Sequence, residues 1–203
     1  MPVKGHKNIL VFFMKDYLEE LLDGFRSTDS DVVKRAIYNE MLMVVNSYCK
    51  NVRYGCYDMF MYVALYKCAV TSQQYEYALN QAYSIVDDAA FQENDDLISN
   101  FKEFVSLADC LREEDKVEFD IICMTELDFF QKELEWAKDQ VKCGQADFGA
   151  DVLIPNAVNE LREVAELIVS TGMSDLESYR EAIKHLKWWE NLAVSVSHGF
   201  FVN

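Results

Sequence analysis

Apolar residues recur every three or four positions along most of this chain, and no other pattern limits its fold as strongly. Residues at that spacing share one face of an α-helix, so each stretch can bury a stripe against a neighbouring helix. The chain holds only 7 Gly and 2 Pro in 203 residues, too few for the frequent turns of a many-stranded β-sandwich or barrel. We therefore predict an all-α fold, an irregular multi-helix bundle of about eight helices.

Several residues mark where helices begin and end. The segments 71–74 (TSQQ) and 174–177 (SDLE) have the pattern of capping boxes, in which side chains satisfy the unpaired backbone N–H groups at a helix start. Pro155 fits the first position of a following helix because its missing N–H would have no partner there, and Gly172 fits the C-terminal cap of that helix. The short link after Gly172 predicts that the last two helices pack as an antiparallel hairpin.

The predicted organisation is a single all-α domain over residues 1–203. The loop-like stretch GQADFGAD at 144–151 offers an alternative, a bundle over 1–143 followed by a helical hairpin over 155–203. The predicted helices differ in length and show no fixed period, which favours an irregular bundle over a repeat solenoid.

Two of the predicted helices are expected to lie deepest in the fold. Residues 56–70 are apolar on nearly every side, which is typical of a central helix. A longer helix from about 114 to 143 carries one apolar stripe that we expect to face inward, formed by Phe119, Cys123, Leu127, Phe130, Leu134, Ala137 and Val141.

Acidic side chains are concentrated in the middle of the chain. Residues 58–151 carry 7 basic and 21 acidic side chains and so hold -14 of the net charge of -16. This block disfavours direct binding to nucleic acid or to an anionic membrane, because like charges repel. The carboxylates that we expect to contact a partner are Asp87, Asp88, Glu93, Asp95, Asp96, Asp109, Glu113, Glu114, Asp115, Glu118, Asp120, Glu126 and Asp128.

Two interpretations of these carboxylates stay open. Gathered on one face, they would resemble the nucleic-acid backbone and could occupy the basic groove of a DNA- or RNA-binding protein. Alternatively, they only keep an aromatic-rich bundle soluble. Spread evenly, the net charge amounts to one per ~600 Å² of surface, far less dense than duplex DNA, so the first interpretation requires the carboxylates to lie side by side.

Trp188 and Trp189 are the other candidate interaction residues. Adjacent residues of a helix diverge by about 100°, so both side chains cannot occupy the centre of one buried stripe. Together with the apolar tail at 194–203, they favour an alternative function as a structural or assembly protein that acts through oligomerisation.

Motifs of enzymes are scarce, and we expect a non-enzymatic protein with no catalytic residue, no metal and no cofactor. The chain has three histidines and lacks a Gly-rich phosphate loop, a Walker motif and a nucleophile elbow. The enzyme alternative is an all-α metal-dependent nucleotide phosphohydrolase, for which Glu163 and Glu166 supply one Glu-x-x-Glu pair. Arg180 stands where the second helix needs a carboxylate, and a guanidinium cannot ligate a cation.

Cysteine spacing and hydropathy indicate the compartment. The six cysteines contain no CxxC pair and match no zinc pattern, and their positions on apolar helix faces fit free thiols in a reducing cytoplasm, with disulfides as the alternative. Uncharged runs are much shorter than the ~18 residues that span a bilayer, so no transmembrane helix is expected. The apolar run at 9–14 has no cleavage site after it and is interpreted as part of a helix.

Residues Glu160 to Gly172, followed by Ser174 to Arg180, form a helix, a glycine turn and a second helix with an aspartate and a tyrosine near its start. This segment, a fifth of the chain, resembles small helical-hairpin proteins of unassigned function from tailed bacteriophages. The resemblance implies a viral origin and therefore the host cytoplasm. With that origin, this small acidic helical protein resembles phage inhibitors of host defence, including anti-CRISPR and anti-restriction proteins. The expected partner is then a protein with a basic surface, with a homo-oligomer as the alternative.

Overall fold

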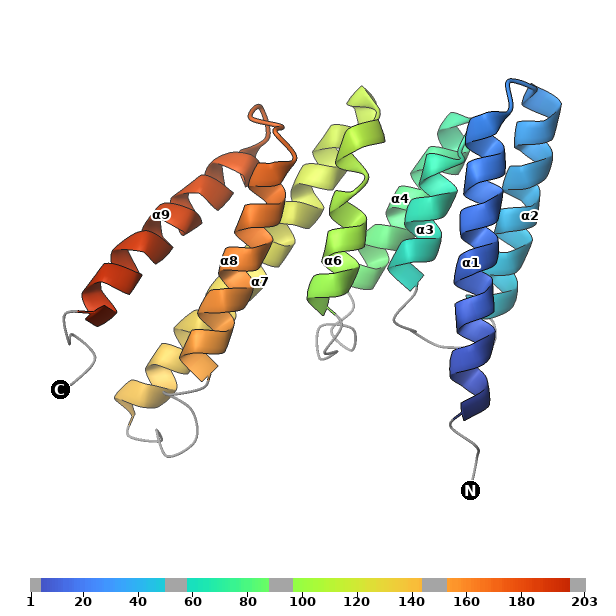
Figure 1. The fold of residues 1–203 in the computed structure, drawn as a ribbon. Helices are drawn as coiled ribbons and strands as arrows, with labels where there is room; N and C mark the ends of the chain where they lie inside the picture. The colour runs from blue at the N-terminus through green and yellow to red at the C-terminus, as the bar shows by residue number, and fades with distance from the viewer. Residues whose placement is uncertain (1–4, 50–57, 88–96, 144–152, 198–203) are drawn as a thin grey trace. The chain divides into compact units, whose positions relative to one another are not determined.

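The computed structural model describes residues 5–49, 58–87, 97–143 and 153–197 (Figure 1). Within these residues the chain forms eight α-helices and two short 3₁₀ helices and no strand, which confirms the prediction of an all-α fold. The contacts divide the chain into two compact units, Met1–Cys110 and Leu111–Asn203. The expectation of a single domain stays a prediction.

The described residues of the first unit form five α-helices and one 3₁₀ helix. They are α1 (Gly5–Ser27), α2 (Asp31–Cys49), α3 (Asp58–Lys67), α4 (Ser72–Asp87), α6 (Leu97–Val105) and η1 (Ala108–Cys110). The apolar run at 9–14 lies inside α1, in agreement with its interpretation as helix. Helix α3 packs against α1, α2, α4 and α6, and eight of its ten residues are buried. It is therefore the central helix that its lack of a polar face predicts.

The capping box at 71–74 forms as predicted. The Gln74 side-chain oxygen accepts hydrogen bonds from the backbone N–H groups of Val70, at 2.8 Å, and Thr71, at 3.1 Å. In return, the backbone N–H of Gln74 donates to the Thr71 hydroxyl oxygen at 3.4 Å. These reciprocal bonds satisfy amide groups that have no partner within the helix, and α4 begins at Ser72.

The described residues of the second unit form η2 (Glu113–Asp115), α7 (Lys116–Lys142), α8 (Leu153–Ser170) and α9 (Glu177–Ser197). The last three helices all pack on one another. Helices α8 and α9 run in opposite directions from their short link, which is the predicted antiparallel hairpin (Figure 1). Gly172 adopts a φ of 68° in that link, a left-handed conformation that glycine tolerates best and that commonly ends helices.

Two predicted helix starts differ from the structure. Pro155 is the third residue of α8 rather than the first, although it still lies in the first turn, where a missing N–H leaves no bond broken. Helix α9 begins at Glu177, so Ser174 is not its N-cap. A residue from another helix supplies that cap.

The predicted inward stripe of the long helix is buried in α7. Phe119, Cys123, Leu127, Phe130, Leu134 and Ala137 are all at most 2% exposed, whereas the side chain of Val141 lies outside the described residues. The helices that the structure describes include none with the length and apolar content to cross a membrane.

Candidate functional site

Of the thirteen carboxylates expected to form one surface, the structure describes the side chains of eight, one in the first unit and seven in the second. Asp88, Glu93, Asp95 and Asp96 lie outside the described residues, as does the side chain of Asp87 at the end of α4. Asp109 is exposed on η1 in the first unit. The other seven, Glu113 to Asp128, belong to η2 and α7 of the second unit.

The start of α7 lies next to the link between α8 and α9. The Lys116 ammonium is 2.8 Å from a carboxylate oxygen of Glu113 and 3.6 Å from one of Asp175. Segments about 60 positions apart in the sequence are thereby brought together. Both carboxylates remain exposed, whereas the side chain of Lys116 is mostly covered.

Arg112 organises the two carboxylates that follow Glu113. Its Nε and Nη2 donate to the two carboxylate oxygens of Asp115 at 2.6 and 2.8 Å, a bidentate pair. Its Nη1 lies 2.8 Å from Glu114. Asp115 is only 7% exposed, so it differs from the expectation of a water-facing contact residue, whereas Glu114 projects into solvent.

Asp120 supplies the missing cap of α9. Its two carboxylate oxygens accept hydrogen bonds from the backbone N–H groups of Glu177, at 3.1 Å, and Ser178, at 2.8 Å. A carboxylate at a helix N-terminus satisfies unpaired amides and interacts favourably with the helix dipole. Arg180 completes this region by pairing with Glu177 at 2.6 Å and donating to the backbone carbonyl of Asp175 at 2.8 Å.

We call this region the acidic end of the second unit. Its carboxylates outnumber its cations by two to one, since Arg112, Lys116 and Arg180 are the cations that pair within it. The carboxylates of the acidic end are Glu113, Glu114, Asp115, Asp120, Asp175 and Glu177. Glu113, Glu114, Asp175 and Glu177 are the exposed members.

Glu126 contradicts the expectation of an exposed carboxylate. Its side chain is fully buried, and neither of its carboxylate oxygens has a hydrogen-bond partner among the described residues. Burial raises the pKa of Glu126 to about 8, because an apolar surrounding disfavours the charged form. Glu126 is seven residues after Phe119 and so falls in the middle of the apolar stripe of α7.

The last two carboxylates of the expected set lie along α7. Glu118 is half-buried in the first turn of the helix. Asp128 is exposed and pairs with Lys132, one turn later, at 2.5 Å. Asp128 follows Asp120 by more than two helical turns, so the expected set extends along the helix rather than gathering at its start.

Trp188 and Trp189 are both half-buried within the second unit. The ammonium of Lys138, on α7, lies 4.5 Å from the centre of the Trp188 ring. The guanidinium of Arg162, on α8, lies 5.9 Å from the centre of the Trp189 ring. The divergence between adjacent helical residues thus lets α9 place one indole against each neighbouring helix. Residues 198–203 of the apolar tail lie outside the described part of the chain.

Two of the residues considered for metal-dependent chemistry, Glu166 and Arg180, take part in ion pairs. Glu166 lies 3.8 Å from Arg162, and Glu177 pairs with Arg180. Where the structure describes the chain, it contains no group of three His, Cys, Asp or Glu side chains placed to hold a metal ion.

No protein-family model, curated protein or solved structure matches this chain.

Sequence reasoning placed Glu113, Glu114 and Asp120 in a common cluster but missed Asp175 and Glu177 as their neighbours. The SDLE segment pointed only to a local cap. The predicted hairpin fixes how α8 meets α9, but it carries no information on which turn of α7 the link approaches.

Proposed function

We propose that this protein is a non-enzymatic binding protein whose acidic end occupies a basic surface on a nucleic-acid-handling protein. The observation that supports this proposal is the gathering of carboxylates from 113–120 and 175–177 around only three cations. This group of carboxylates has an excess of negative charge, as the phosphate backbone of a nucleic acid does, and a basic groove binds such an excess.

The net charge of the whole second unit also favours binding to a basic surface. Residues 111–203 carry 19 acidic and 9 basic side chains, so this half of the chain contributes -10 of the net -16. Complementary fields raise association rates and make them sensitive to salt. The exposed ion pairs of the acidic end are each worth at most about 1 kcal/mol, so a basic partner can displace them at small cost.

The phage resemblance of residues 160–180 narrows the class of partner. We infer from this resemblance that the protein inhibits a host defence complex of the anti-CRISPR or anti-restriction type by occupying its basic groove. The competing interpretation is that the carboxylates only maintain solubility, and the experiment below is designed to separate the two.

The test uses a variant in which three exposed carboxylates of the acidic end are neutralised: Glu113→Gln, Glu114→Gln and Asp175→Asn. Asp115 and Asp120 are left in place because they hold Arg112 and the start of α9. The matched control neutralises three exposed carboxylates elsewhere in the same unit: Asp128→Asn, Glu135→Gln and Glu166→Gln. Both variants change the net charge by the same amount.

Each form of the full chain is immobilised and exposed to bacterial lysate at low and high salt. We expect the wild type and the control to capture nucleases or DNA-binding complexes at low salt, to lose them at high salt, and to release them when duplex DNA is added. The acidic-end variant should capture little. Equal loss in both variants, or capture that duplex DNA does not displace, would refute a specific role of the acidic end. Salt-resistant self-association would favour the assembly alternative.

A further inference from the structure

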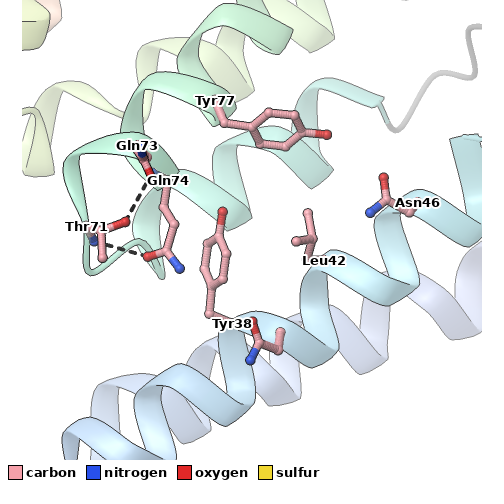
Figure 2. Close-up of a pocket in the computed structure, with 8 residues that line it drawn as sticks. Tyr38, Leu42, Asn46, Thr71, Gln73, Gln74 and Tyr77 are labelled. Carbon is pink, nitrogen blue, oxygen red and sulfur yellow. Dashed lines mark hydrogen bonds between the residues drawn. The ribbon is translucent and has the colours of Figure 1, made fainter.

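A second candidate site lies in the first unit, where a pocket of about 430 Å³ opens between α2 and the start of α4 (Figure 2). None of its eight lining residues carries a charge. In a chain with 27% charged residues, about two charges would be expected among any eight surface positions. The lining instead contains four side-chain amides, three hydroxyl groups and Leu42. It is therefore suited to an uncharged ligand that has both donors and acceptors.

The amides come from both helices. Asn39 and Asn46 are exposed on α2, two turns apart on one face of the helix, and Gln73 and Gln74 belong to the first turn of α4. The capping bonds fix the orientation of Gln74, because its Oε1 accepts from two backbone N–H groups. Its Nε2 is therefore a donor, and Figure 2 shows this nitrogen on the side of Tyr38.

Two tyrosines supply the aromatic part of the lining. The Tyr77 ring projects from α4 on the side of the pocket opposite Leu42 of α2 (Figure 2), and this side chain is 37% exposed. An edge-to-face contact with Tyr62, with ring centres 6.4 Å apart, holds the Tyr77 ring in place. Burial raises the pKa of Tyr38 to about 12, so its hydroxyl keeps its proton at physiological pH.

We propose that this pocket binds an uncharged purine base or nucleoside. Asn and Gln amides can form paired hydrogen bonds with the adjacent donor and acceptor on the edge of adenine, and an aromatic ring offers a surface on which a base stacks. The lining has no cation to neutralise a phosphate, and the chain carries a net charge of -16. These charges favour a nucleoside over a nucleotide.

The test is isothermal titration of the full-length protein with adenosine, AMP, uridine and maltose. The variants are Tyr77→Ala, which removes the stacking ring, and Asn39→Ala, which removes one amide from an exposed position. Asn159→Ala is the matched control, since it removes an exposed helical Asn from α8 of the other unit. Tyr77→Phe keeps the ring, and circular dichroism establishes that each variant retains its helix content.

We expect saturable binding of adenosine, weaker binding of AMP and uridine, and none of maltose. Tyr77→Ala and Asn39→Ala should each weaken adenosine binding by about tenfold, whereas Tyr77→Phe and Asn159→Ala should leave it within about twofold. Absence of saturable adenosine binding, binding of AMP as tight as that of adenosine, or binding of maltose in its place would each overturn the proposal. If adenosine still binds to both alanine variants with the affinity of the wild type, its binding site lies outside the pocket, and the proposal is likewise wrong.

Discussion

The buried Glu126 allows the sharpest quantitative test of the second unit. We consider Glu126→Gln, which keeps the size and shape of the side chain and removes its ability to ionise. In the folded protein the pKa of Glu126 is about 8, against an ordinary value of 4.5, because burial opposes the charge. The folded state therefore holds this proton more tightly than the unfolded chain does, and rising pH penalises folding.

The size of the penalty follows from the difference between the two pKa values. Each pH unit between 4.5 and about 8 removes about 1.4 kcal/mol of stability, so the loss is about 3 kcal/mol at pH 7 and about 4 kcal/mol at pH 8. Below pH 4.5 the carboxyl is protonated in both states and the penalty disappears. The amide of the Glu126→Gln variant cannot ionise, so this variant should match the wild type below pH 4.5, exceed it in stability by about 1 kcal/mol at pH 5 and exceed it by about 3 kcal/mol at pH 7.

The tryptophans make the second unit measurable on its own. All three, Trp136, Trp188 and Trp189, belong to residues 111–203, so urea unfolding followed by tryptophan fluorescence reports on that unit. The measurement is repeated at pH 5, 6, 7 and 8 for the wild type and Glu126→Gln. Burial lowers the pKa of His185, which gives a dependence of opposite sign, but this dependence is common to both proteins and cancels in their difference.

The control is Glu135→Gln, an exposed carboxylate on the same helix that accepts a hydrogen bond from Gln131. Its effect should stay below about 0.5 kcal/mol at every pH. If the difference between Glu126→Gln and the wild type does not grow from pH 5 to pH 8, then Glu126 does not ionise in a desolvated site. The reasoning from its burial would then be wrong.

Three further substitutions test how the helices are terminated. Asp120→Ala removes the acceptor of two amides at the start of α9 and should destabilise the second unit by about 2 kcal/mol in the same fluorescence assay, against less than about 0.5 kcal/mol for Asp128→Ala. Gly172→Ala should cost about 1–2 kcal/mol through backbone strain alone, because a Cβ there would meet no atom within 4 Å; an unchanged urea midpoint would exclude that strain. Gln74→Ala should reduce the thermal stability of the first unit, followed by circular dichroism, by about 1 kcal/mol, while Gln74→Glu, which retains the acceptor, should cost less.

Local signals in the sequence identified most of the helices. The capping box at 71–74 and the glycine at 172 act through residues within four positions of the helix end, so their effect could be predicted from the sequence alone. The start of α9 could not be predicted this way, because its cap comes from Asp120, 57 residues earlier. Helix-capping rules consider only residues close in sequence, so they cannot predict a cap formed by a carboxylate on another helix.

The burial of Glu126 was indicated by helix periodicity, but the acidic nature of its side chain favoured an exposed position. Its spacing of seven residues from Phe119 places it in the buried stripe of α7, but acidic residues are rarely buried without a partner, and composition argued for the surface. The position of the acidic end depends on how the α8–α9 link meets α7, which is a matter of tertiary packing. Helix periodicity defines the faces that pack, and it leaves the axial register between two helices undetermined.

The cap that Asp120 forms on α9 also affects the order in which the helices become stable during folding. Leu176 directly precedes helix α9, and its side chain has no oxygen that could cap the helix, so we expect the first amides of α9 to gain their acceptor only after α7 has docked. Closing a loop of this length carries an entropic cost that a local cap avoids. In hydrogen-exchange experiments, the amides of Glu177 and Ser178 should therefore open together with the α7 interface rather than fray separately.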